Sequence, residues 1–199
     1  MRASLLLMFM LLFNLSAIEE IKYEVLKKDG PFELRDYSSY IIAEIEVKGS
    51  ATEAGNKAFR RLFRYISGNN KMKAKVAMTA PVTQEAKSKK IAMTAPVNQE
   101  AKGEAWLVSF VMPMEYQLED LPQANDKAIK LRLVEKRKMA AVRYSGRWTE
   151  SNYLAHKKKL ETWVTAEKLS IEGAVVWARY NSPFSFWFMR RNEVLFPVK

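Results

Sequence analysis

Alternating apolar and polar positions predict β-strands in the first part of the chain and again in its last part. From Ile41 to Val47 every second residue is apolar, which is typical of a strand with one buried face. Similar short patterns predict strands at 23–26, 32–35, 40–47, 105–112, 129–135, 139–144, 174–180 and 193–198.

Two segments have helical periodicity, one in each half of the chain. Ser50 and Glu53 have the spacing of a capping box, which begins a helix that runs to Ile66 and ends at Gly68. A second helix is predicted to begin at Ser151 and to end before Gly173. Each half therefore has the order strand, strand, helix, strand, strand. This order favours an α+β fold, an antiparallel sheet or barrel with one helix per half and approximate internal symmetry.

The apolar arc of the first helix is wider than packing on a sheet requires. At about 100° per residue the small and apolar side chains cover roughly 180°, centred near Leu62, while a stripe of about 100° is enough. The surplus lies at the edge formed by Phe59 and Phe63, and Arg60 is the next residue round the helix. Such an edge suits a flat apolar ligand that carries carboxylates. The alternative is that both rings are ordinary core residues.

A seven-residue phrase occurs twice, as VAMTAPV at 76–82 and as IAMTAPV at 91–97. Each copy is predicted to be the end of a strand that its proline stops, because proline has no N–H to donate to a neighbouring strand. The threonine and methionine of the phrase have no general base near them in the sequence, so the phrase does not indicate an active site.

The first 17 residues differ in kind from the rest. Arg2 precedes an apolar run from Leu5 to Leu15, and Ser16 and Ala17 are small residues suited to cleavage. The run is short for a bilayer span. The pattern predicts a signal peptide at 1–17 and a single domain at 18–199, in a periplasmic or secreted protein, with a retained anchor as the alternative.

The chain has no cysteine and a formal net charge of +11. An exported chain without disulfides fits a periplasmic space better than animal secretion. The positive charge suits an acidic ligand or an anionic membrane face, whereas export disfavours nucleic acid. We expect no nucleic-acid partner, at most peripheral contact with a membrane, and a monomer.

No motif indicates an enzyme or a resident metal. The single histidine, His156, shares a helical face with Tyr153 and Leu160, so we expect it to be packed and hydrogen bonded. Without a second histidine or a cysteine, the common zinc and iron ligand sets are excluded. Nucleophile elbows and phosphate loops are absent from the sequence. The aromatic segment 184–189 is predicted either to seal the end of the barrel or to line a pocket.

Six motifs, in their order over residues 21–199, resemble the SOUL heme-binding family. They are FELRDY at 32–37, FRRLFRYISGN at 59–69, the two Met-Thr-Ala-Pro-Val blocks, SFVMP at 109–113, YSG at 144–146, and YNSP at 180–183 with RRNEV at 190–194. The resemblance implies a distorted antiparallel β-barrel of two pseudo-symmetric repeats, each with one helix, related to bacterial effector-binding domains. It also implies non-covalent binding of heme or another tetrapyrrole, without catalysis.

The resemblance further implies where heme would lie. Other members are thought to hold heme in a shallow groove, through apolar contacts with the helix of the first repeat and basic residues near the propionates. The matching helix here carries the predicted heme-binding residues Phe59, Arg60, Arg61, Leu62, Phe63 and Arg64. Asp36 stands where some members have a proposed axial histidine, so we expect no ligation from that position.

Two hypotheses follow from the sequence. The leading one is an exported carrier or buffer of heme or a related tetrapyrrole. The alternative is a module that binds a non-heme effector or a partner with the same face of the barrel.

Overall fold

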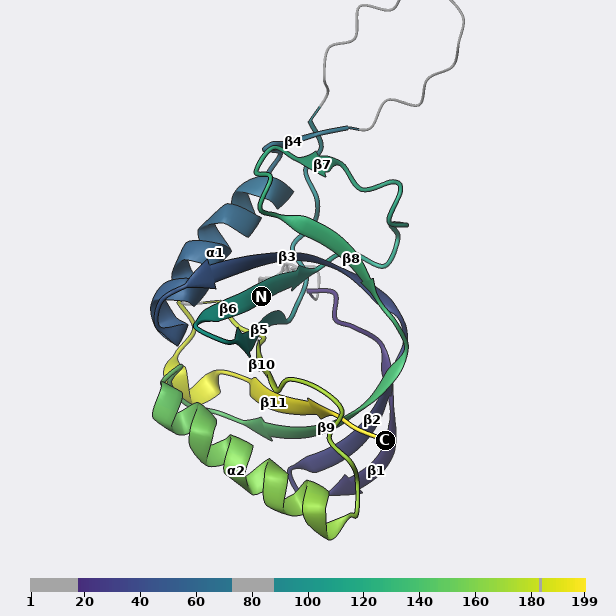
Figure 1. The fold of residues 1–199 in the computed structure, drawn as a ribbon, viewed down its shortest axis with the longest axis vertical. Helices are drawn as coiled ribbons and strands as arrows, with labels where there is room; N and C mark the ends of the chain where they lie inside the picture. The colour runs from purple at the N-terminus through teal and green to yellow at the C-terminus, as the bar shows by residue number, and fades with distance from the viewer. Residues whose placement is uncertain (1–17, 73–87, 183) are drawn as a thin grey trace, which may run out of the picture.

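A curled antiparallel sheet with two helices on its outer side forms the described part of the molecule (Figure 1). The structure is a computed structural model that describes residues 18–72, 88–182 and 184–199. The sheet contains β1 (Tyr23–Asp29), β2 (Phe32–Tyr37), β3 (Tyr40–Lys48), β5 (Val97–Lys102), β6 (Ala105–Val111), β8 (Lys130–Val134), β9 (Arg137–Tyr144), β10 (Val176–Arg179) and β11 (Asn192–Pro197). Two short strands, β4 (Asn70–Lys71) and β7 (Gln123–Ala124), pair separately, and η1 (Trp187–Met189) is a 3₁₀ turn.

The order of the strands has an internal symmetry. The order is β1-β2-β9-β11-β10-β5-β6-β3-β8. Four pairs of strands correspond to each other: β2 and β8, β3 and β9, β5 and β10, and β6 and β11. If the members of each pair are exchanged, the order from β2 to β8 is read in reverse. The centre of this symmetry lies between β5 and β10, which pair antiparallel. The predicted α+β fold of two similar repeats is therefore confirmed.

Each repeat places one helix on the outer face of the sheet (Figure 1). Helix α1 (Ala51–Ile66) packs on β3 and β6 through Ala58, Leu62 and Tyr65, and helix α2 (Glu150–Ala166) packs on β9 and β11 through Leu160 and Trp163. The opposite face of the curled sheet packs against itself, with side chains from strands near both ends of the order. Its apolar residues include Tyr37, Ile42, Val134, Met139 and Leu195.

The sequence located α1 correctly and extended α2 too far. Ser50 and Glu53 form the predicted capping box, and Gly68 has a φ of 110°, as the predicted left-handed end of α1 requires. Helix α2 begins at Glu150, one residue before the predicted start, and ends at Ala166. The chain leaves the helical conformation at Lys168, which has a φ of 57°.

Strand β5 was missed, and the second copy of the repeated phrase does not end a strand as predicted. Val97, the last residue of the second copy, is the first residue of β5. A proline just before a strand needs no ladder N–H, so Pro96 is compatible with the start of β5 as well as with a strand end. Two hydrogen bonds fix the second copy in place: Ala95 N donates to Glu19 O at 2.9 Å, and Thr94 Oγ1 donates to Val111 O. The first copy, like the predicted signal peptide, lies outside the described residues.

Candidate functional site

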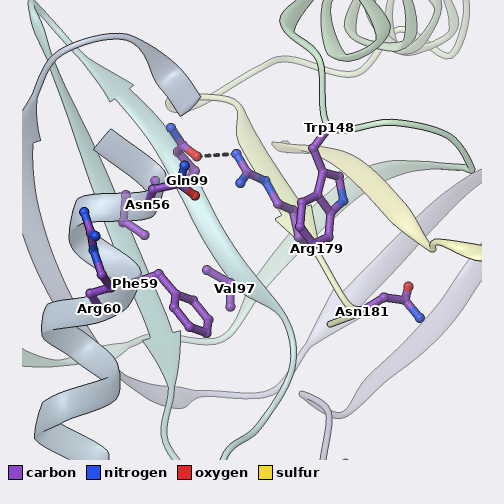
Figure 2. Close-up of a pocket in the computed structure, with 10 residues that line it drawn as sticks. Asn56, Phe59, Arg60, Val97, Gln99, Trp148, Arg179 and Asn181 are labelled. Atoms are coloured by element: carbon purple, nitrogen blue, oxygen red, sulfur yellow. Dashed lines mark hydrogen bonds between the residues drawn. The ribbon is translucent and has the colours of Figure 1, made fainter. Parts of the chain in front are cut away.

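A pocket of about 320 Å³ lies over β5 and β10, on the outer face of the sheet between α1 and the chain that leads into α2. Figure 2 shows Asn56, Phe59 and Arg60 on one side and Trp148 on the other, with Gln99 and Arg179 between them. This volume is at the lower end of the range of small-molecule sites, roughly 300–1,000 Å³. The pocket therefore lies at the centre of the sheet's internal symmetry, where neither helix covers the strands fully.

The pairing of β5 with β10 places the floor of the pocket. Arg179 lies opposite Val97 and Trp177 lies opposite Gln99. Successive side chains of a strand point to opposite faces, so these four share the face toward the helices. Ala178, between Trp177 and Arg179, belongs to the core on the other face.

Gly55 lets α1 approach this floor closely. A Cβ atom at Gly55 would lie 3.0 Å from Gln99 Oε1 and 3.4 Å from Arg179 Nη1. Gln99 Nε2 donates to Ala51 O at 2.7 Å, and Gln99 Oε1 accepts from Arg179 Nη2 at 2.5 Å. The first turns of α1 are thus tied to both central strands through Gln99.

Trp148 forms the opposite wall of the pocket, and contacts with three other side chains fix its position. Its Nε1 donates to Oδ1 of the buried Asn192 at 2.7 Å. The guanidinium of Arg190 lies 4.2 Å from the centre of its ring and that of Arg179 lies 5.5 Å away. The indole plane is therefore fixed before any ligand arrives.

The aromatic edge of α1 exists as the sequence predicted. Phe59 and Phe63 stack with ring centroids 6.0 Å apart, and Phe59 and Phe110 pack edge to face with ring centroids 5.3 Å apart. Phe59 is partly buried, whereas Phe63 is 46% exposed. Phe59 thus belongs to both the core and the pocket, and Phe63 extends the aromatic surface beyond it.

The structure divides the six predicted heme-binding residues among different surroundings. Phe59 and Arg60 line the pocket, and Phe63 adjoins it through Phe59. Leu62 is completely buried in the core beneath α1, so it has no surface to offer a ligand.

The other two arginines lie elsewhere. Arg61 donates through Nε and Nη2 to the carboxylate of Asp126 at 2.6 and 2.7 Å, and these hydrogen bonds lower the pKa of Asp126. Arg61 and Arg64 line a separate hollow near Asn69. The structure therefore brings together Phe59, Arg60 and Phe63, and places Arg61, Leu62 and Arg64 away from the pocket.

His156 is packed and hydrogen bonded, as predicted. Its ring stacks on Tyr144 with centroids 4.0 Å apart, and its Nδ1 donates to Asn152 O at 2.8 Å. It does not belong to the pocket lining. Asp36 forms an ion pair with Lys136 at 2.9 Å. Within the described ranges, no group of three His, Cys, Asp or Glu side chains is placed to hold a metal ion.

The aromatic segment does not seal the barrel, and it does not belong to the lining of this pocket. Its exposed side chains are Phe184, Phe186, Trp187, Phe188 and Met189, with Phe184 97% exposed. The segment is attached through its backbone, since Trp187 O accepts from Gly146 N at 3.1 Å. No helix of the described residues is long and apolar enough to cross a membrane.

Sequence reasoning missed most of the pocket. Its unpredicted lining residues include Gln99, Trp148, Arg179 and Asn181. One signal was present in the sequence, because Arg179 is a charged residue at the end of the apolar run Val175–Ala178. Gln99 offered no such signal, since β5 is polar throughout most of its length.

A second hollow, also of about 320 Å³, lies beside the loop after β6. Its lining includes Tyr40, Met112, Tyr116 and Leu133. None of the described residues that line it is Lys or Arg. Its lining carries the acidic Glu119, and Lys89, which is outside the lining, lies 4.4 Å from the ring centre of Tyr116. The hollow therefore suits a carboxylated ligand less well than the pocket lined by Arg60 and Arg179.

A family model described as SOUL heme-binding protein matches residues 18–197. The chain belongs to the SOUL heme-binding family. This SOUL chain is 27% identical over 172 residues to "Heme-binding protein 1" of Xenopus laevis, covering 85% of each chain. It is 25% identical over 169 residues to the mouse protein of the same name, covering 84% of each.

Solved structures similar to this SOUL chain support the fold alone, because their sequence identity is low. A hydrolase from Listeria innocua superimposes with a TM-score of 0.57 at 12% identity, covering 87% of this chain and 94% of the other. The C-terminal domain of EcmrR superimposes with a TM-score of 0.54 at 11% identity, covering 89% and 98%. The half-barrel with two outer helices is thus shared with these two proteins.

Proposed function

We propose that this protein binds heme or a related tetrapyrrole, non-covalently and without catalysis, in the pocket between α1 and Trp148. The observation that carries the proposal is the composition of that pocket. Aromatic rings at Phe59 and Trp148 bound an apolar space, and the guanidinium groups of Arg60 and Arg179 border it. Membership of the SOUL family and relatives named heme-binding protein support the same ligand class.

The pocket is small for a whole macrocycle, so the ligand would be held in part. One edge of the ring would enter between Phe59 and Trp148, and the exposed face of Phe63 would extend the apolar contact. Buried apolar area contributes about 25 cal/mol per Å², so this contact would add to the affinity in proportion to the apolar area that it buries. Arg60 is exposed, and would meet a carboxylate at the water-facing side of the ligand.

Coordination of the iron is not part of this proposal. The described residues that line the pocket are Gly, Asn, Phe, Arg, Val, Gln and Trp, none of which is a usual axial ligand of heme. The proposal therefore predicts recognition of the tetrapyrrole ring and its acid groups rather than of the metal.

The test is a titration of the purified protein with hemin, followed in the Soret band, and with metal-free protoporphyrin IX, followed by fluorescence. We expect saturable one-to-one binding of both, with affinities within a few-fold of each other. Binding of neither would contradict the proposal and would favour the non-heme effector or partner module. Binding of hemin alone would contradict recognition through the ring and its acid groups.

We further propose that the protein acts as a carrier or buffer in an exported compartment, periplasmic or secreted. The support is in the sequence, where Arg2 and the apolar run Leu5–Leu15 have the dimensions of a signal peptide. N-terminal sequencing of protein recovered from the exported fraction should begin near residue 18. Recovery of intact Met1 in a soluble cytoplasmic fraction would contradict this location.

A further inference from the structure

The guanidinium group of Arg179 lies in an unusual setting at the base of the pocket. It packs 4.3 Å from the ring centre of Trp177, and Nη2 donates to the neutral amide oxygen of Gln99 at 2.5 Å. Its Nε atom is buried and has no hydrogen-bond partner in the structure. A guanidinium carries five N–H donors in a planar fork, so most of its donor capacity is unused here.

Arg179 is partly buried, and a fully buried arginine of the same protein has a different setting. Arg35 donates through Nη1 and Nη2 to the buried carboxylate of Glu193 at 2.7 and 3.2 Å. Arg179 has no such partner, because no carboxylate of residues 18–72, 88–182 and 184–199 lies within ion-pair distance of it. Burial lowers the pKa of Arg179 to about 10, so the group is still charged at neutral pH. A charge withdrawn from water without a counter-ion costs stability, and an anion would offset that cost.

Access to this charge comes from the pocket. Arg179 is one of its lining residues, and Gly55 leaves space beside Nη1, where a Cβ would lie at 3.4 Å. Arg60, on the next turn of α1, adds a second positive charge at the pocket's border. The rings of Trp177 and Trp148 lie against the guanidinium group of Arg179 and reduce its contact with water, which strengthens an ion pair formed there.

We propose that Arg179 anchors a carboxylate of the bound ligand, so that the pocket selects tetrapyrroles with free acid groups over their esters. A carboxylate matches the fork of a guanidinium through two parallel hydrogen bonds, which makes it a better partner than a single neutral acceptor. This inference rests on the proposed function, since it names the part of the tetrapyrrole that the pocket recognises.

The test compares hemin with hemin dimethyl ester, in which both propionates are neutral, on wild-type protein and on Arg179→Gln. Wild-type protein should bind hemin about tenfold or more tightly than the ester. Arg179→Gln should lose about tenfold in affinity for hemin and almost none for the ester. Arg179→Lys keeps the charge but not the planar fork, so its affinity for hemin should lie between those of wild-type protein and Arg179→Gln. Arg143→Gln, which removes an exposed arginine outside the pocket, is the matched control and should leave both affinities unchanged.

The possible results separate the two proposals. If wild-type protein binds hemin and the ester equally, the anchor is contradicted while tetrapyrrole binding stands, and this comparison needs no variant to fold. If Arg179→Gln lowers the affinities for hemin and for the ester equally while its thermal unfolding is unchanged, Arg179 shapes the pocket and anchors no carboxylate. If wild-type protein binds neither ligand, the proposed function fails and the inference fails with it.

Discussion

Arg35 and Glu193 form an ion pair of 2.7 Å between two side chains that are 2% and 0% exposed, on the sheet face opposite the helices. Tyr180 also donates to Glu193, at 2.8 Å. The pair joins β2 to β11, which lie on either side of β9 in the sheet. The inner face of the half-barrel is therefore held together by this ion pair as well as by apolar packing.

Removing one charge of this pair should be costly. We expect Glu193→Gln to lower the free energy of unfolding by about 3–5 kcal/mol, because it removes the buried carboxylate that pairs with Arg35 and Arg191 and leaves Arg35 with Glu33 as its remaining ion-pair partner. Urea denaturation measures the change. Glu46→Gln is the matched control, since Glu46 pairs with Lys102 in water at 2.7 Å, and it should leave the midpoint unchanged. Equal midpoints for wild-type protein and Glu193→Gln would show that the pair is not a determinant of stability.

Neighbouring residues of α1 should separate stability from binding. Leu62 is completely buried, so Leu62→Ala should cost about 2–5 kcal/mol of stability. Phe63 is 46% exposed, so Phe63→Ala should cost clearly less and should instead weaken tetrapyrrole binding. Thermal unfolding and Soret titration of the two variants check both statements. Similar large losses of melting temperature would show that Phe63 is an ordinary core residue.

The aromatic edge was predictable because helical periodicity is a local property of the sequence. The capping box, the end at Gly68 and the exposed position of Phe63 all follow from residues within one helix. Strand β5 was not predictable in this way. It buries the polar side chains of Asn98 and Gln99 on opposite faces, so it lacks the apolar alternation that marks a strand.

The pocket depends on contacts between distant parts of the chain, which no local pattern contains. Gln99 and Arg179 meet only because β5 pairs with β10, and Trp148 faces them because Asn192 holds its indole. The sequence could mark Arg179 as a charged residue in an apolar strand, but it could not show that no carboxylate lies beside it.

The two exposed arginines of α1 should differ in their effect on binding. Arg60 lines the pocket, whereas Arg64 lines a separate hollow one turn further along. Arg60→Gln should therefore weaken hemin binding and reduce its dependence on salt, since a screened contact with a carboxylate is lost. Arg64→Gln removes the same charge and should change neither. Soret titrations at two salt concentrations measure both effects. A larger effect of Arg64→Gln would contradict this prediction and would place the ligand near the hollow that Arg64 lines.

His156 should not be needed for binding. Its Nδ1 is committed to Asn152 O and its ring to Tyr144, outside the pocket lining. His156→Ala should leave hemin affinity within a few-fold of wild type, although the loss of stacking should lower the melting temperature. Abolished hemin binding, with protoporphyrin IX binding retained, would identify His156 as an axial ligand instead.

The location of the bound ligand tests the central claim most directly. We would record ¹H–¹⁵N spectra of the labelled protein during titration with zinc protoporphyrin IX, whose diamagnetic metal leaves nearby signals visible. The account predicts that the largest shifts fall on three segments that meet only in the folded chain, together with the indole N–H of Trp148. These segments are 55–63 of α1, 97–99 of β5, and 179–181 at the end of β10. Shifts centred instead on the second hollow, at 112–119, or on the exposed segment 184–189, would contradict it.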